Sequence, residues 1–495
     1  MSSEQAKEDL RASFKKERLA KIEQLPGGAS PYPSSYAKEH NHADIQQKYA
    51  HLKAGDETQD TLSVAGRIVG MRNNGLFIDL RDESGKLQLF CHANKLSEDA
   101  QTLLTKLDLG DWIGAKGLVR KTPRGEVTLD VTTLTLLAKC FQPMPDKYHG
   151  MNDPEARFRQ RYVDLIANAH ARDTLKTRAR ILTHFRHLLA QKGFLEVETP
   201  MLQSIAGGAL AKPFQTHHNA LHCDLFLRIA PELYLKRLVV GGFEKIFEIN
   251  RCFRNEGLSP RHNPEFTSLE VYEAFVDYKA MMALTEYLVS ETAALLFNDE
   301  PVVYNDKPLN LKAPWPQKTM AQLVQEKTGI DFMHLQDATE AAAAAKKIGI
   351  HTEKHHGWGK ILATVFEERV EDTLIQPIHV VGFPKEVSPL AKEDPNDPRL
   401  TERFETYING WEIANGFSEL NDPIDQEQRF KAQEQAALAG EDETHEMDTD
   451  YITALEYGLP PTGGLGIGMD RLTMLLTNAS SIREVIAFPT LRPLK

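Results

Sequence analysis

Arg254 and Arg471 stand in the two segments of the chain whose residue types could bind a nucleotide. Arg254 is followed two residues later by Glu256. A planar guanidinium can clamp a phosphate group, and a carboxylate can accept a hydrogen bond from an adenine amino group. Phe266 adds a ring on which a base can stack. Taken alone, Arg254 and Glu256 could also be a surface ion pair, which would contribute only about 0 to 1 kcal/mol to stability.

Three glycines precede Arg471 with a period of two residues, Gly464, Gly466 and Gly468. This period is typical of a strand with its glycines on one face, where a flat ligand or another backbone must approach closely. The run matches neither G-x-G-x-x-G nor the P-loop pattern. A tight packing corner is the alternative for the glycines alone. The position of Arg471, where the predicted strand gives way to a helix, favours a binding site.

The elements that position Arg254 are predicted to be two antiparallel strands. Residues 247–253 alternate like a half-buried strand, residues 255–263 are polar, and residues 266–274 resume an extended pattern. We therefore expect a hairpin with Arg254 and Glu256 on one face at the end of its first strand.

The segments around Arg254 and before Arg471 resemble motifs 2 and 3 of the class II aminoacyl-tRNA synthetases, and Gly193–Pro200 resembles motif 1. Within this family, Ala230–Lys236 and Asn415–Leu420 are most similar to bacterial-type lysyl enzymes. The HIGH and KMSKS signatures of class I are absent from the sequence. The resemblance implies an α+β protein with an N-terminal OB-fold β-barrel and a class II catalytic domain, an antiparallel sheet flanked by helices.

The resemblance implies lysine–tRNA ligation, in which ATP activates L-lysine to lysyl-adenylate, pyrophosphate leaves, and lysine passes to the 3′ end of tRNA(Lys). The lysine carboxylate is already a nucleophile, so catalysis needs positioning and charge neutralisation rather than a general base. The implied ATP-binding residues, with Arg254 and Arg471 as the catalytic pair, are Arg254, Glu256, His262, Asn263, Phe266 and Arg471. The implied lysine-binding residues are Gly208, Glu232, Glu270, Tyr272, Asn415, Phe417 and Glu419.

Two further roles follow from the same resemblance. Glu405 and Glu412 match Mg²⁺ ligands, and hard carboxylate oxygens suit this ion. They are seven residues apart on what is predicted to be extended chain, so a bend or bulge must bring them together. Pro200 would lie at the interface of a homodimer.

Charge accounts for a preference for lysine. A substrate with two ammonium groups needs several carboxylates, because a buried unpaired charge is costly. By resemblance, Glu232 and the backbone of Gly208 bind the α-amino group, while Glu270 and Glu419 bind the ε-ammonium group with help from Tyr272. The related aspartyl enzymes have an arginine at the position of Glu419. For Glu419 alone, a helix N-cap or a surface acid is the alternative.

The chain is predicted to contain an N-terminal helical extension (1–60), an OB-fold anticodon-binding domain (61–140), a linker (141–163) and the catalytic domain (164–495) with a helical insertion (315–375). Short strands are expected at 62–68, 76–80, 87–91, 112–119 and 127–137, with a helix near 97–107. The resemblance assigns anticodon binding to Arg72, Phe77 and Glu126, and the alternative for Phe77 is the barrel core. His351, His355 and His356 are expected to be surface histidines rather than metal ligands.

Composition limits the partners and the compartment. A net charge of −12 argues against general nucleic-acid binding, so tRNA contacts must come from local patches. Four cysteines without a C-x-x-C pair fit a reducing cytoplasm, and no apolar stretch is expected to span a membrane. Two rivals remain: relatives that modify a translation factor, which lack the anticodon domain, and a non-enzymatic OB-fold binding protein with a degenerate synthetase domain. The strands at 62–137 argue against the first, and the complete set of site residues argues against the second.

Overall fold

The computed structural model describes residues 3–25, 30–144, 151, 153–209, 211–298, 300–353, 355–438 and 447–493. The chain divides into two compact units, residues 1–150 and 151–495. Within the predicted linker, residues 145–150 and 152 lie outside the described residues. Its C-terminal part is helical, with α4 (Pro154–Arg159) and the start of α5 (Arg161–Ala167).

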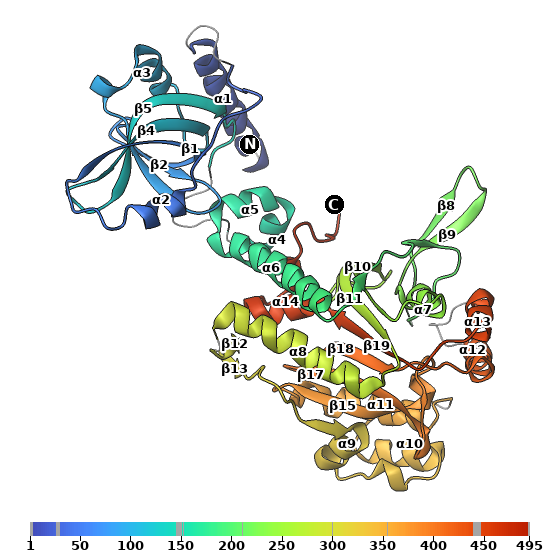
Figure 1. Ribbon diagram of the computed structural model, residues 1–495. Helices are drawn as coiled ribbons and strands as arrows, with labels where there is room; N and C mark the ends of the chain where they lie inside the picture. Colours follow the sequence, from blue (N-terminus) through green and yellow to red (C-terminus); the bar gives the residue numbers. More distant parts are fainter. Residues whose placement is uncertain are drawn as a thin grey trace. The chain divides into compact units, whose positions relative to one another are not determined.

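The first unit contains a closed five-stranded barrel, which confirms the predicted OB-fold (Figure 1). Its strands follow the order β1-β2-β3-β5-β4 and comprise β1 (Glu57–Arg72), β2 (Phe77–Arg81), β3 (Lys86–Phe90), β4 (Trp112–Lys121) and β5 (Val127–Ala138). Helix α3 (Glu98–Leu104) begins at Ser97, whose hydroxyl accepts a hydrogen bond from the Ala100 amide. Helices α1 (Ser3–Glu23) and α2 (His42–Lys48) precede the barrel. Every predicted strand overlaps an observed one.

The second unit is built on a nine-stranded sheet. Its strands, in order across the sheet, are β14 (Gln317–Thr319), β15 (Ile378–Pro384), β17 (Asp397–Ile408), β18 (Trp411–Ser418), β19 (Thr462–Gly468), β11 (Glu265–Ala274), β10 (Lys245–Phe253) and β6 (Leu195–Glu196), with β16 (Glu393–Asp394) paired to β17. Pairing is antiparallel except at the two ends, where β14 joins β15 and β6 joins β10 in parallel. The predicted antiparallel sheet is therefore confirmed at its centre and mixed at its edges.

The period-two pattern of the central strands separates the two faces of this sheet. On β11, Leu269 and Val271 belong to the main hydrophobic core, whereas Glu270 and Tyr272 line a cavity on the other face. The core is completed by helices α6 (Ala169–Gln191), α8 (Tyr278–Phe297) and α14 (Met469–Thr477). Helices α6, α8 and α14 therefore pack against one face of the sheet (Figure 1), and the cavity lies on the other face.

We expected no apolar stretch long enough to span a membrane, and one helix contradicts this expectation by its length and composition. α8 is long and apolar enough to do so. Its residues Met281, Leu284, Leu288 and Val289 are buried in the main core, where they pack with the sheet. The apolar length of α8 is explained by its place as a core helix.

Smaller elements complete the unit. They are β7 (Leu202–Gln203), β8 (Gln215–His218), β9 (Cys223–Leu227), α7 (Glu232–Val240), β12 (Val302–Tyr304), β13 (Lys307–Leu309), α9 (Met320–Thr328), α10 (Ala338–Lys347), α11 (Trp358–Arg369), α12 (Pro423–Leu438), α13 (Thr449–Glu456) and α15 (Ile482–Val485). Helices α9 to α11 lie in the predicted insertion and pack in a second hydrophobic core, which also includes Val380 of β15 and Tyr407 of β17. Two of the histidines expected to be surface residues, His355 and His356, lie with Glu353 close enough together to hold a metal ion at the surface.

Candidate functional site

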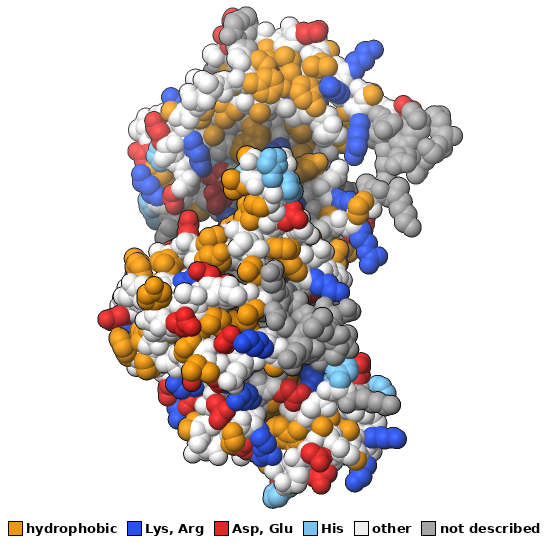
Figure 2. Space-filling model, turned by 90° about the vertical axis from the view of Figure 1, so that its right-hand side faces the viewer, with side chains coloured by type: hydrophobic (Ala, Val, Ile, Leu, Met, Phe, Trp, Pro, Cys, Tyr) orange, Lys and Arg blue, Asp and Glu red, His pale blue; other side chains and the backbone are white. Residues whose placement is uncertain are grey.

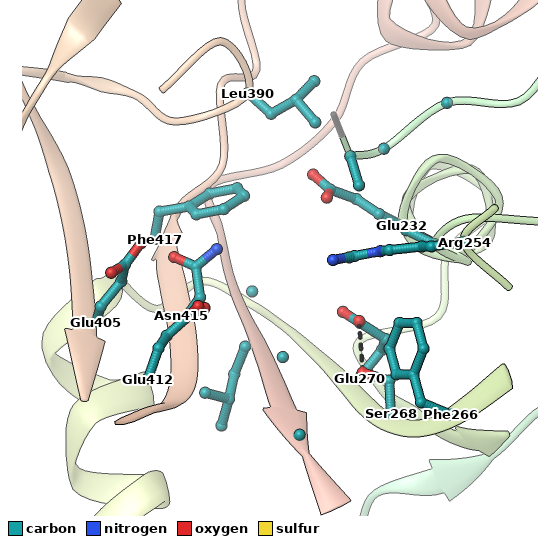
Figure 3. A pocket seen from close by; sticks show the side chains of 18 of the residues that line it. Glu232, Arg254, Phe266, Ser268, Glu270, Leu390, Glu405, Glu412, Asn415 and Phe417 are labelled. Carbon is teal, nitrogen blue, oxygen red and sulfur yellow. Dashed lines mark hydrogen bonds between the residues drawn. The ribbon is translucent and has the colours of Figure 1, made fainter. Parts of the chain in front are cut away.

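A cavity of about 460 Å³ lies on the polar face of the sheet. Every residue predicted to bind ATP, lysine or metal lines it. Figure 3 shows Glu232, Arg254 and Glu270 on one side of the cavity, facing Asn415 and Phe417 on the other. The residues come from strands, two helices and loops, with Gly208 and Arg471 263 positions apart in the sequence, and the fold brings them into one site.

Strand register places the cavity residues in two parallel rows across the sheet. Because directly paired residues point to the same face, each row is a set of neighbouring side chains. One row is Glu405, Asn415, Gly466, Glu270 and Glu248. The next is Arg403, Phe417, Gly464, Tyr272 and Ile246. In both rows a glycine of β19 lies at the centre, with larger side chains on either side.

The two central glycines make room for carboxylates. A Cβ atom at Gly464 would overlap Glu419 Oε1 and come within 2.9 Å of the Tyr272 ring. A Cβ atom at Gly466 would lie 3.3 Å from Glu270 Oε1. The period-two glycines were predicted to admit a flat ligand or another backbone. Instead, side-chain carboxylates occupy the space over these two glycines.

Replacing Gly464 with alanine should abolish activation of the amino acid, because the new methyl group must displace the Glu419 carboxylate or the Tyr272 ring. We expect roughly 100-fold or greater loss of kcat/KM for lysine in ATP–pyrophosphate exchange, given that overpacking typically costs about 1–3 kcal/mol and the carboxylate is also misplaced. Gly85→Ala is a suitable control, since a Cβ atom there meets nothing within 4 Å and Gly85 does not line the cavity. Equal activity of the two variants would contradict this role of Gly464.

Three acidic side chains surround one end of the cavity. Glu232 is the first residue of α7 and packs beside Gly208. Burial, together with the nearby Glu232 carboxylate, raises the pKa of Glu270 to about 8. Glu419 is only 1% exposed, and its Oε1 has no hydrogen-bond partner among the described residues. A buried carboxylate oxygen without a donor is costly, so this end of the cavity suits a cationic ligand.

Arg254 and Phe266 define the other end. The Arg254 guanidinium lies over the Phe266 ring, 5.0 Å from its centroid, and Arg254 Nε is buried without a hydrogen-bond partner in the described part of the chain. Strand β10 ends at Phe253, so Arg254 and Glu256 lie in the loop rather than on one face of a strand as predicted. Both still line the cavity. The unpartnered donor of Arg254 suits an anionic ligand such as phosphate or carboxylate.

His262 and Arg471 are linked by a hydrogen bond. Arg471 can only donate, so the 3.0 Å contact makes His262 Nε2 an acceptor, and His262 Nδ1 then donates to Ser259 Oγ at 2.7 Å. Burial and the adjacent Arg471 charge lower the pKa of His262. Arg471 also donates to the Glu412 carbonyl at 2.9 Å. Neutral His262 and the Glu412 backbone therefore hold Arg471 against the cavity.

Asn263 and Asp470 already have protein partners. Asn263 Nδ2 donates to the Glu265 carbonyl at 2.6 Å, and Asn263 Oδ1 accepts from the Thr490 amide at 3.3 Å. Asp470 accepts from the Thr267 amide at 2.6 Å. These bonds anchor the loop before β11 and the start of α14, so they shape the ATP end of the cavity.

Glu405 and Glu412 lie on the two strands of a hairpin, β17 and β18, and not on one extended segment as predicted. Asn409 and Gly410, both with positive φ, form the turn. The expected irregularity is present as a shift of register between Thr406 and Tyr407. Burial and the Glu412 carboxylate raise the pKa of Glu405 to about 7. Glu405 Oε1 and Oε2 already accept hydrogen bonds from Arg403 and Tyr407, and Glu412 adds a second carboxylate nearby. Two neighbouring carboxylates suit a hard divalent cation.

Arg403 in the cavity and Lys236 behind its wall were missed as functional candidates. Arg403 donates to Asn415 Oδ1 at 3.0 Å and to Glu405 Oε1 at 2.6 Å, so it joins the lysine-binding and metal-binding candidates. Its position two residues before Glu405, on the same strand face, was the available signal. Lys236 lies behind the cavity wall and pairs with Glu232, four residues earlier on α7. That i, i+4 spacing was the signal for it.

The barrel residues predicted to bind the anticodon lie apart from this cavity. Arg72 and Phe77 are paired at the ends of β1 and β2, and Arg72 donates to both carboxylate oxygens of Asp79. Phe77 is half-buried and contacts Phe90 at a centroid distance of 5.1 Å, outside the barrel's hydrophobic core cluster. Glu126 is exposed at the start of β5. The placement of Phe77 favours an accessible ring over the core alternative.

Pro200 is exposed in the segment between β6 and β7. Leu195, Met201 and Leu202 around it are exposed apolar side chains. An exposed apolar strip beside a sheet edge is typical of a protein interface.

Comparisons with known proteins agree with the fold and the cavity. Residues 153–492 match the family described as tRNA synthetases class II (D, K and N), and residues 62–137 match an OB-fold nucleic acid binding domain. The chain therefore belongs to the class II tRNA synthetases of this group.

Similar proteins from several bacteria are named lysine–tRNA ligase. One from Carboxydothermus hydrogenoformans is 51% identical over 97% of this chain and 98% of its own length. One from Sinorhizobium medicae is 50% identical over 93% of each chain. Another from Agrobacterium fabrum is 48% identical over 97% of this chain and 96% of its own.

Proposed function

We propose that this chain is a lysine–tRNA ligase, which activates L-lysine with ATP and transfers it to the 3′ end of tRNA(Lys). The observation that carries this proposal is the cluster of Glu232, Glu270 and Glu419 in the cavity that Arg254 also lines. An amino acid with two ammonium groups fits three carboxylates better than a neutral or acidic one. The near full-length similarity to proteins named lysine–tRNA ligase supports the same substrate.

The first step joins a lysine carboxylate oxygen to the α-phosphorus of ATP and breaks the bond to pyrophosphate. Arg254, with its unpartnered Nε, is suited to hold the α-phosphate and the lysine carboxylate together. The adenine base would lie between Phe266 and Arg471, with Glu256 accepting from its amino group and His262 near the phosphates. In the second step a ribose hydroxyl of tRNA displaces AMP from the lysyl carbonyl.

Glu405 and Glu412 are the proposed Mg²⁺ ligands. Burial and repulsion from the Glu412 carboxylate both raise the pKa of Glu405. A divalent cation between the two carboxylates would remove this repulsion. The ion would neutralise phosphate charge during activation.

Glu405→Gln should raise the Mg²⁺ concentration that supports half-maximal exchange by about tenfold or more, because one anionic ligand is lost. A Mg²⁺ titration of ATP–pyrophosphate exchange measures it. Glu402→Gln, on the same strand but outside the cavity lining, is the control. An unchanged Mg²⁺ requirement in the Glu405 variant would exclude it as a ligand.

Lysine binding should strengthen as pH rises from about 6.5 to 8. The pKa of Glu270 is raised to about 8, so without lysine this group is mostly protonated at neutral pH. Its ionised form is the one that binds an ammonium group, so KM for lysine should fall by up to roughly tenfold per pH unit below that pKa. KM for ATP is the internal control. A KM for lysine that is flat over this range would contradict an ionised Glu270 in the complex.

The OB-fold barrel supports tRNA as the acceptor. Phe77 offers a ring for stacking an unpaired base, Arg72 is its partner across β1 and β2, and Glu126 offers an exposed carboxylate just before β5. On the face drawn in Figure 2, Lys and Arg side chains are interspersed with Asp and Glu side chains. Recognition by local groups, rather than by a broad basic surface, fits the net charge of −12.

We further propose a cytoplasmic homodimer. The exposed apolar side chains around Pro200 support an interface there. The four cysteines are all unpaired, as expected in a reducing compartment.

Aminoacylation tests the proposal against its nearest rival. We expect this protein to charge tRNA(Lys) with lysine, and Phe77→Ala to reduce charging while leaving ATP–pyrophosphate exchange unchanged. Exchange with lysine but no charging of any tRNA would favour a protein-modifying enzyme instead.

A further inference from the structure

Lys236 is a buried ammonium group directly behind the proposed lysine pocket. Its side chain is fully buried, and its Nζ pairs with Glu232 Oε1 at 2.6 Å and with Glu419 Oε2. The rings of Phe417 and Tyr451 lie 5.4 and 5.8 Å from Nζ. Lys236 does not line the cavity, whereas both of its carboxylate partners do.

The two bonds of Lys236 leave one oxygen of each partner for a ligand. Glu232 retains Oε2, and Glu419 retains Oε1, which has no hydrogen-bond partner among the described residues. The side chains of Glu232 and Glu419 are thus joined through a single buried cation. Because both carboxylates pair with the same Nζ, their positions relative to each other depend on Lys236.

Lys236 also affects the net charge of the proposed lysine pocket. Glu232, Glu270 and Glu419 together carry three negative charges if all are ionised, and Lys236 offsets one of them. The two that remain equal the two ammonium groups of lysine, while Arg254 can offset the substrate carboxylate. Without Lys236 the pocket would hold one carboxylate too many for lysine, and a buried unpaired charge is costly.

We propose that Lys236 is a positioning residue that sets the spacing and the net charge of the lysine pocket by bridging Glu232 and Glu419. The inference rests on the proposed function and specifies how that site selects a diammonium substrate. Lys236 acts through the two glutamates and does not touch the substrate.

The protonation of Glu419 after loss of Lys236 depends on the charged and titratable groups that face it. They are Lys236 and Glu232 on α7, Glu270 and Tyr272 on β11, and Tyr451 on α13. Burial raises the pKa of Glu419, and Lys236 opposes that rise as the adjacent cation. Its removal should therefore favour the protonated form of Glu419, which cannot neutralise an ammonium group.

The test compares Lys236→Met, which removes the charge but keeps an unbranched stem, with Lys236→Arg, which keeps the charge. ATP–pyrophosphate exchange is measured from pH 6.5 to 9. For Lys236→Met we expect KM for lysine to rise at least roughly tenfold at pH 7 and to recover as pH increases, with KM for ATP within twofold of wild type. Lys236→Arg should retain the wild-type pH profile. Lys245→Met removes a partly exposed lysine paired with Glu273 and is the matched control.

A KM for lysine that changes in parallel with KM for ATP, or a Lys236→Met profile without an alkaline shift, would overturn the proposal. If the methionine variant fails to fold, Lys236→Gln replaces it and is judged by the same shift. Failure of the proposed function is distinguishable, because wild-type protein would then show no lysine-dependent exchange at any pH.

Discussion

Glu419→Gln is expected to raise KM for lysine by about 100-fold or more while leaving KM for ATP within twofold of wild type. The amide keeps the shape of the side chain but removes a buried negative charge, and breaking a buried ion pair costs about 3–5 kcal/mol. That loss falls on the ammonium end of the cavity, because Glu419 lies among Glu232, Glu270 and Tyr272. ATP–pyrophosphate exchange with each substrate varied in turn measures the effect.

Glu273→Gln is the matched control for this substitution. Glu273 lies on β11 but pairs with Lys245 and does not line the cavity. Its replacement should change neither KM. Equal losses for lysine and ATP in the Glu419 variant would argue for general damage to the site and against a role in binding the ε-ammonium group.

Arg254→Lys is expected to lower the rate of adenylate formation by about 100- to 1,000-fold, equivalent to about 2.7–4 kcal/mol of transition-state stabilisation. Lysine keeps the charge but lacks the planar fork that can hold a phosphate oxygen and a carboxylate oxygen together. Single-turnover formation of the aminoacyl-adenylate measures this step directly.

Arg251→Lys provides the comparison for Arg254→Lys. Arg251 lies on β10, three residues before Arg254, pairs with Glu265 at 3.4 Å and does not line the cavity. It should tolerate the change. A variant of Arg254 with a wild-type rate of adenylate formation and a raised KM for ATP alone would place Arg254 in ground-state binding only.

The barrel and the hairpin were predictable from sequence because their signals are local. Strands β1 to β5 alternate apolar and polar residues, and β11 does so through Leu269, Glu270, Val271 and Tyr272. In a sheet with one face on a core and the other on a cavity, this alternation directly indicates which side chains are available for binding.

Features that depend on contacts between distant segments were not predictable in this way. The hairpin that joins Glu405 to Glu412 depends on a two-residue turn at Asn409 and Gly410, which spacing alone did not reveal. The glycines of β19 were expected to admit a ligand, whereas the side chains of Glu419 and Glu270 occupy the adjacent space. Such pairings arise from strand register across the sheet, which a single sequence does not specify.

The bonds of Asn263 illustrate the same limit. The family resemblance assigned Asn263 to ATP. Its side-chain amide instead donates to the Glu265 carbonyl and accepts from the Thr490 amide. The second partner lies 227 positions along the chain. Only the folded structure separates a side chain that shapes the cavity from one whose polar atoms remain available to a ligand.

Amino-acid-dependent ATP–pyrophosphate exchange tests most directly whether this cavity selects lysine. Lysine, aspartate and asparagine are compared at equal concentrations with the wild-type protein. Three carboxylates around the cavity predict strong exchange with lysine and little with aspartate or asparagine. Exchange with aspartate but not with lysine would contradict the assignment of Glu232, Glu270 and Glu419 as its specificity determinants.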